Sequence, residues 1–168
     1  ASKNHGKLPV WNLKDLYNSH NDKNLIRDLN DIQKNTLKFE KKYLNKVKTL
    51  SADNLHKAIK QLEQIDELMD KILSYAHLLV AEDGNNEKNK IFYQQMQETI
   101  TNYASSIIFF TLELNQMTEK QINKLVKNHN LQIYKNWIIN KRSLKPYQLD
   151  LKIEKILQDK SITSHSAW

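Results

Sequence analysis

The sequence contains no cysteine in its 168 residues, which excludes disulfide bonds, zinc sites with thiolate ligands, iron–sulfur clusters and catalysis by a thiol. Glycine and proline occur only twice each, about 2% of the chain where an average protein has roughly 12%. That scarcity excludes collagen-like chains, flexible linkers and most turn-rich β-sandwiches. Residues 1–10 contain no apolar run of the kind that forms the centre of a signal peptide. A chain of this kind fits a reducing compartment, and we expect a cytoplasmic protein.

Long hydrophobic runs are also missing. The most apolar stretch, residues 103–114, is well short of the roughly 20 residues that span a bilayer, and it is interrupted by Ser105, Ser106, Thr111 and Glu113. We therefore expect no membrane partner. Apolar residues make up 39% of the chain and charged residues 27%, which is enough apolar material for one domain with a core.

Arginine is scarce although the chain is basic. Lysine and arginine number 26 against 19 acidic residues, a formal net charge of +7, yet only Arg27 and Arg142 are arginine. Lysines gather around positions 34–48, 120–127 and 135–145, so a phosphate-binding face is conceivable. Because specific phosphate and base contacts are made preferentially by arginine, we expect no nucleic-acid partner.

Residue patterns that carry catalysis or metal binding are few. The six histidines are at positions 5, 20, 56, 77, 129 and 165, and no two are four residues apart, so the two-histidine zinc motif is missing. With glycine only at 6 and 84, a glycine-rich phosphate loop is excluded. Asp53 and His56 would share a helix face, but two ligands make a poor metal site, and an acidic residue in a first helical turn is the ordinary interpretation of Asp53. We assign no catalytic, cofactor-binding or metal-binding residue.

Three further features have both a functional and a structural interpretation. His77 lies near an apolar stripe, where we expect a core imidazole hydrogen-bonded to a neighbouring helix. Two carboxylate pairs have the spacing of an acid and a base, but we favour a solvated helix face for both: Glu63 with Glu67, and Asp66 with Asp70. Aromatic residues at helical spacing are expected in the core rather than in a peptide-binding groove: Trp11, Tyr17, Tyr75, Phe92, Tyr93, Phe109 and Phe110.

Helical periodicity dominates the chain. From Leu55 to Val80 the apolar residues recur at the three-then-four spacing of a helix with one buried face. Ser51 is placed to cap its start, and Gly84 is placed to end it in a left-handed turn. Thr118 and Gln121 have the form of a capping box, which predicts a short helix over residues 119–128.

Similar stripes predict a helix from position 22 to near 50, one over 91–114, and short helices over 131–141 and from 146 or 148 to 158. Their expected core-facing positions include Ile26, Leu37, Ile91, Ile133, Leu149, Ile153, Ile156 and Leu157. No alternating strand pattern competes. The fold class predicted is all-α, an antiparallel bundle of long helices followed by two or three shorter ones, without significant sheet.

The expected organisation is an initial segment (1–20), a long-helix bundle (21–117), shorter helices (118–160) and an extended connector (161–168). The last of these is Ser-rich and ends on Trp168. We interpret the chain as one section of a longer protein, the connector leading to a domain that this sequence lacks.

Several blocks in order resemble the N-terminal region of the oligoendopeptidase F family. The first, from Leu8 to Tyr17, is similar to the family's Trp-Asp-Leu-x-Asp-Leu-Tyr opening, with Asn12 in place of Asp. Further blocks follow: Ser74-Tyr75-Ala76-His77-Leu78, then Glu82-Asp83, then Ser143 to Leu149 with Tyr147 where His is common, then Glu154-Lys155-Ile156-Leu157, Lys160-Ser161 and Ser166-Ala167-Trp168. Together the blocks span nearly the whole chain.

The resemblance implies an intracellular, mainly helical zinc metallopeptidase that cleaves short peptides in a closed chamber. In that family the zinc ligands and the general base lie on a His-Glu-x-x-His helix and a later Glu, downstream of the segment that this sequence resembles, so zinc is expected only in the full-length enzyme. This segment is expected to be a non-catalytic wall, inactive alone, with Trp11, Leu13, Leu16 and Tyr17 anchoring its start. Its partners would be its own catalytic domain, short peptides and, for the isolated segment, a second copy. The alternative is a free-standing basic helical module that binds an acidic partner.

Overall fold

The computed structural model describes the backbone of residues 12–165 and the side chains of residues 12–161. Within that part the chain is helical and has no strand, which confirms the all-α prediction. Three long helices come first: α1 (Lys23–Tyr43), α2 (Ala52–Glu82) and α3 (Glu87–Ile107). Shorter helices follow: α4 (Phe109–Gln116), α5 (Glu119–Leu125), α6 (His129–Gln132), α7 (Lys135–Ser143) and α8 (Leu151–His165). Three 3-10 turns lie between them: η1 (Leu13–Asp15), η2 (Val47–Thr49) and η3 (Lys145–Tyr147).

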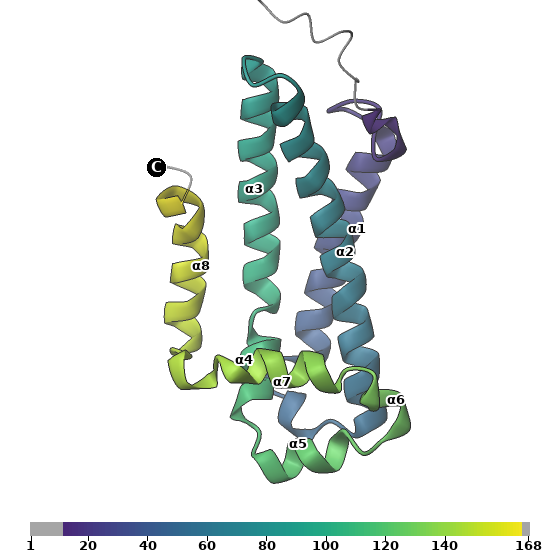
Figure 1. Ribbon diagram of the computed structural model, residues 1–168, viewed down its shortest axis with the longest axis vertical. Helices are drawn as coiled ribbons and strands as arrows, with labels where there is room; N and C mark the ends of the chain where they lie inside the picture. The colour runs from purple at the N-terminus through teal and green to yellow at the C-terminus, as the bar shows by residue number, and fades with distance from the viewer. Residues whose placement is uncertain (1–11, 166–168) are drawn as a thin grey trace, which may run out of the picture.

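The long helices form an antiparallel three-helix bundle in which each packs on the other two (Figure 1). At about 1.5 Å per residue the 31 residues of α2 make a rod of roughly 46 Å. Its start is capped by the Ser51 side chain, as expected, and α1 is capped by Asp22. The predicted capping box of Thr118 and Gln121 is present at the start of α5. Local sequence signals therefore determine where these helices begin.

The short helices close one end of the bundle. In Figure 1, α5, α6 and α7 lie across the lower end, and α8 turns back to stand beside α3. The predicted centre of packing is confirmed, because Phe109 and Phe110 are fully buried and Ile107 is nearly so. At the other end Tyr17 is 2% exposed, and Leu13 and Leu16 pack on the core, so three of the four expected anchors are in place. Trp11, the fourth, lies outside the described residues.

The prediction that Gly84 ends the second long helix in a left-handed turn is wrong. The helix α2 ends at Glu82, and Gly84 has no left-handed φ. The left-handed residue is instead Asn45, with φ 62°, directly after the C-cap of α1. Asparagine is among the residues that tolerate this conformation best, since its short side chain can bond locally.

Several predicted boundaries also differ from the structure. The helix expected over 91–114 is divided at Ile108, and the one expected over 131–141 is divided between α6 and α7. The short α5 ends three residues before the predicted Asn128, whereas α8 continues to His165, through part of the stretch expected to be extended.

The apolar stripes were wrong about several residues. Ile26, Leu37 and Ile91 are about half exposed, and Ile133 is 79% exposed. The other misplaced residues lie in or just before α8, where exposure runs from 47% to 58%: Leu149, Ile153, Ile156 and Leu157. Periodicity identifies an apolar helix face, but it does not show which face meets the bundle.

Across the part of the chain with described coordinates, no helix combines the length and the apolar character needed to cross a membrane.

Candidate functional site

Asp53 and His56 lie in the first turns of α2, where they contact residues around α6. The Asp53 carboxylate accepts hydrogen bonds from the side-chain amides of Asn128 (3.3 Å) and Asn130 (3.4 Å). The His56 ring lies 5.6 Å from the ring of Tyr134. Among the side chains of residues 12–161, no three His, Cys, Asp or Glu are placed to hold a metal ion. The pair thus holds α6 against α2, and its surroundings do not fit a zinc site.

Glu63 of α2 contacts Tyr134, the residue before α7, and Asp66 lies near Lys141 of α7. The Tyr134 hydroxyl donates a 2.5 Å hydrogen bond to Glu63. Partial burial, and then this contact with Glu63, raise the pKa of Tyr134 to about 12. Displacement of water around the Asp66 carboxyl and the charge of Asp70 raise the pKa of Asp66 to about 6, against the opposing charge of Lys141. Glu63, Asp66, Glu67 and Asp70 are all exposed, as the expectation of a solvated helix face requires, and Glu63 in addition accepts the bond from Tyr134.

His77 is not the core histidine that the sequence predicted. Its side chain is exposed, and its ring lies 5.7 Å from the ring of Tyr93 on α3. The preceding residues, Tyr75 and Ala76, take the buried positions on this turn of α2. The histidine therefore lies on the surface, beside Tyr93 of α3.

The aromatic residues form the core rather than a groove, as expected. The Tyr17 ring packs edge-on against Tyr75 at 5.2 Å, and Tyr75 in turn meets Phe92 at 6.1 Å. Phe109 and Phe110 pack around Phe39 near the other end of α1. Tyr93 is only partly buried, and Trp11 lies outside the described residues.

The lysines of α1 are exposed. Lys38 and Lys42 border a small cavity of about 120 Å³ between α1 and α2, together with the amide side chain of Gln61. The Lys42 ammonium lies 4.8 Å from the centre of the Tyr43 ring and 3.5 Å from the Gln61 side-chain oxygen. The geometry thus gives Lys42 partners within the chain, and the prediction about nucleic acid stays a prediction.

Glu113 is a buried carboxylate that sequence reasoning did not single out. It is 8% exposed, and its two oxygens accept hydrogen bonds from the backbone N–H groups of Asn45 (2.6 Å) and Val47 (3.1 Å). It thereby ties α4 to the turn between α1 and α2, and the left-handed Asn45 presents its N–H to this carboxylate. The sequence feature that could have identified Glu113 is its position as the one carboxylate in the most apolar stretch of the chain, residues 103–114.

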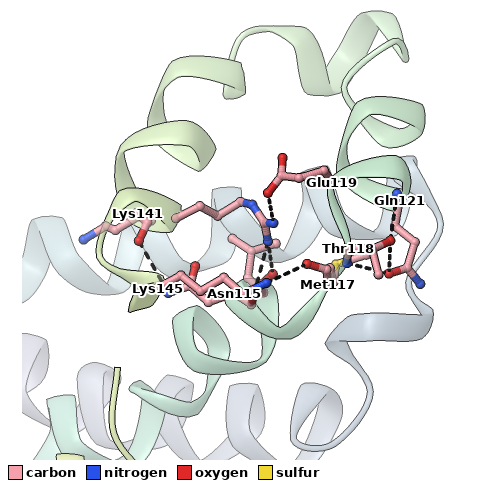
Figure 2. A network of polar contacts seen from close by, with 9 residues as sticks. Asn115, Met117, Thr118, Glu119, Gln121, Lys141 and Lys145 are labelled. Atoms are coloured by element: carbon pink, nitrogen blue, oxygen red, sulfur yellow. Dashed lines mark hydrogen bonds and ion pairs between the residues drawn. The ribbon is translucent and has the colours of Figure 1, made fainter. Parts of the chain in front are cut away.

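Arg142 is another buried charge that sequence reasoning did not single out. It is 8% exposed, and its guanidinium donates a 2.9 Å hydrogen bond to the Leu114 carbonyl and a 2.5 Å bond to Glu119, which is labelled in the polar network of Figure 2. The hydrogen bond and charge of Arg142 lower the pKa of Glu119. Arg142 binds α7 to the end of α4 and the start of α5, because carbonyls at a helix C-terminus lack partners in their own helix. The only sequence feature that set Arg142 apart is that it is one of two arginines in a lysine-rich chain.

Both buried anchors lie in the part of the chain that protein-family comparison matches. Residues 113–168 match the family model of oligopeptidase F. That model describes the N-terminal domain of M3-family peptidases, and the match begins at Glu113 and covers the last third of the chain. Comparison with curated proteins and with solved structures gave no significant match.

The match confirms the resemblance to the N-terminal region of oligoendopeptidase F. The matched segment contains the block from Ser143 to Leu149 and those that follow it. The blocks over residues 8–17, 74–78 and 82–83 lie before the matched segment. The family match therefore does not cover them, and their resemblance is supported by their sequences alone. In the structure the oligopeptidase F-like segment begins within α4, at Glu113, and includes α5, α6, α7 and α8.

Proposed function

We propose that this chain is the non-catalytic N-terminal helical region of an oligoendopeptidase F-like zinc metallopeptidase, where it forms one wall of the chamber that hydrolyses short peptides. The observation that carries the proposal is the match of residues 113–168 to oligopeptidase F. In this proposal the enzyme is cytoplasmic, and the partners of the region are the catalytic domain and the peptide substrates.

The surface of the matched segment supports a role in packing against another domain. Of the eleven large hydrophobic residues that are exposed in the described part of the chain, eight lie in this segment. Four of them belong to α7, η3 and their flanks: Ile133, Ile139, Leu144 and Tyr147. Concentrations of exposed apolar side chains mark interaction surfaces in soluble proteins. Glu113 joins the segment to the turn between α1 and α2, and Arg142 joins α7 to α4 and α5 within the segment.

The described residues supply no zinc site, so the proposal places the zinc and the general base outside this chain. The one acidic-x-x-histidine pair is engaged with asparagine side chains and an aromatic ring, as described above. The contribution assigned to this region is shape: a rigid helical wall that limits which substrates reach the catalytic groups.

A peptidase assay tests the proposal directly. The purified 168-residue chain, with and without added zinc, is incubated with a mixture of quenched short peptides. We expect no cleavage from this chain and no stoichiometric zinc after dialysis. Zinc-dependent cleavage is expected from the product of a reading frame extended to a downstream His-Glu-x-x-His motif.

Two results would contradict the proposal. Cleavage by the 168-residue chain alone would show that a catalytic site lies within it. A reading frame without a downstream His-Glu-x-x-His motif would favour the free-standing basic module instead.

A further inference from the structure

A groove lies between the turn that precedes α2 and the helix α5. Its volume is about 550 Å³, which is within the range of sites that hold small ligands. One side is formed by η2 and the first residues of α2, and the other side by α5 and the residues next to it. Figure 1 shows α5 at the lower end of the bundle, where α2 begins. This feature is called the η2–α5 groove below.

The sides of the η2–α5 groove carry hydrogen-bond donors that have no acceptor. Lys48 of η2 and Lys124 of α5 line its two sides, and neither ammonium has a partner within the described structure. Gln121 lines it as well. The side-chain oxygen of Gln121 accepts from the backbone N–H and the hydroxyl of Thr118, as Figure 2 shows, so its amide N–H groups remain available. The groove thus offers donors to a ligand that is rich in acceptors.

The acidic residues of the elements that form the groove have other partners. Among the described residues that line the groove, none is an aspartate or a glutamate. Asp53, at the start of α2, accepts hydrogen bonds from Asn128 and Asn130. Glu119 of α5 is paired with Arg142. The two lysines are therefore not neutralised within the chain, and the groove is complementary to an anionic ligand.

The groove also has an apolar part. Met117 is buried in the core, Leu50 and Leu125 pack against it, and all three line the groove. Sites for nucleic acid use aromatic rings, on which bases stack, and arginine, which reads base edges. Neither residue type is found among the described residues that line this groove. Two ammonium groups beside leucine side chains fit a peptide that has both carboxylates and an apolar side chain.

We propose that the η2–α5 groove binds a short acidic peptide. Two carboxylates of the peptide pair with Lys48 and Lys124. An apolar side chain between these carboxylates contacts Leu50 and Leu125, and the Gln121 amide donates to a carbonyl of the peptide. The ion pairs make the groove selective for acidic peptides, and the apolar contact adds affinity.

This inference does not rest on the proposed function, because both sides of the groove belong to this chain. The exposed apolar residues that support packing against another domain are not among those that line the groove. A titration of the 168-residue chain with peptide can therefore fail while the peptidase assay succeeds, and the reverse is equally possible.

The first test measures the binding of fluorescein-labelled peptides to the 168-residue chain by fluorescence anisotropy. The peptides Glu-Leu-Leu-Glu and Glu-Leu-Leu-Leu-Glu, with acetylated and amidated ends, allow for two separations of the carboxylates. We expect a Kd of about 100 μM for the tighter of the two. Gln-Leu-Leu-Gln, which lacks the carboxylates, is expected to bind about 10-fold more weakly, and Glu-Ser-Ser-Glu, which lacks the apolar side chains, about 5-fold more weakly.

The second test changes the two lysines. Lys48→Gln and Lys124→Gln are each expected to weaken binding of the acidic peptide by about 3-fold, and the double variant by about 10-fold. The matched control is Lys34→Gln on α1, which removes the same charge from another exposed lysine that does not line the groove. This control is expected to leave the Kd unchanged. The double variant Lys48→Glu with Lys124→Glu is expected to prefer Lys-Leu-Leu-Lys over Glu-Leu-Leu-Glu, and circular dichroism checks that each variant folds.

Three results would overturn the proposal. The first is the absence of peptide binding at about 1 mM chain. The second is an equal loss of affinity from Lys34→Gln and from the two groove variants, which would show a diffuse effect of net charge. The third is a single-stranded oligonucleotide that binds more tightly than the acidic peptide and loses affinity with the same two lysines, which would assign the groove to nucleic acid.

Discussion

The hydroxyl of Tyr17 donates a 2.9 Å hydrogen bond to the carboxylate of Asp28, and through it the segment before α1 is joined to the bundle. The same carboxylate accepts from Lys71 of α2 at 3.0 Å and from Arg27 at 3.1 Å. Burial by itself would raise the pKa of Asp28, but the hydrogen bonds from Lys71, Tyr17 and Arg27 together lower it. A buried carboxylate with three donors thus connects three segments of the chain.

Substituting Tyr17 and substituting Asp28 should both destabilise the fold, but by different amounts. Tyr17→Phe removes one hydrogen bond and is expected to cost about 1 kcal/mol of unfolding free energy. Asp28→Ala leaves the Tyr17 hydroxyl buried without an acceptor and is expected to cost about 3 kcal/mol. Urea unfolding followed by circular dichroism measures both. The exposed Asp15→Ala is the control, and an equal effect of Asp15→Ala and Asp28→Ala would contradict the assignment.

Asp28 also makes the unfolding free energy depend on pH in the acidic range. Its pKa is lower in the folded chain than its ordinary value of 3.8, so its contribution is present above that value. The contribution is lost as the pH falls through the folded-state pKa, because the unfolded chain then binds the proton first. We expect the difference in stability between the wild type and Asp28→Asn to shrink below about pH 4. A constant difference from pH 2 to 7 would contradict this.

Asp66 should act in the opposite sense at higher pH. Its pKa is raised in the folded chain from 3.8 to about 6, so between these values the folded state binds the proton more tightly. The stability of the chain should therefore decrease as the pH rises through this window and stay lower above it. Asp66→Asn removes the effect, and its unfolding free energy should exceed that of the wild type at pH 7 but not at pH 3.5. Equal pH profiles for the two proteins would show that Asp66 titrates normally.

Arg142 should matter for stability more than its ion-pair partner does. Arg142→Ala removes the buried donor to the Leu114 carbonyl, which keeps only the bond from the Met117 N–H, and is expected to cost about 2 kcal/mol. Arg142→Lys should recover only part of this, because a single ammonium cannot reproduce the planar fork of donors that reaches both Leu114 and Glu119. Glu119→Gln should cost less than about 0.5 kcal/mol, since Glu119 is 75% exposed. Thermal or urea unfolding distinguishes these cases, and an equal loss from Glu119→Gln would contradict the role of the backbone contact.

Substitutions at Asn45 and Gly84 test which of the two residues has the left-handed backbone conformation. Asn45→Ala is expected to destabilise the chain by about 1 kcal/mol because alanine is strained at φ 62°, whereas Asn45→Gly should be nearly neutral. Gly84→Ala should be neutral or slightly stabilising, since its backbone is not left-handed and an added Cβ would meet only the Val80 carbonyl oxygen at 3.8 Å. Unfolding midpoints in urea measure all three. A large loss for Gly84→Ala would restore the original prediction.

The sequence by itself determined the helical class, the starts of α1, α2 and α5, and the bulk of the core. These properties depend on residues close together in the chain: the caps at Asp22, Ser51 and Thr118, and the apolar spacing of α2. It also supported the resemblance that the family match to residues 113–168 confirms. Such signals are readable because helix caps and helix faces are set by neighbours three or four residues away.

Only the tertiary structure decided the buried charges, the turns and the orientation of α8. Glu113 binds backbone groups more than 60 residues away, and Asp28 is joined to Lys71 on another helix. The outward position of Ile156 depends on which side of α8 meets α3. No local pattern encodes such relationships, because the free energy of placing a charge or an apolar face is set by whichever distant segment packs against it.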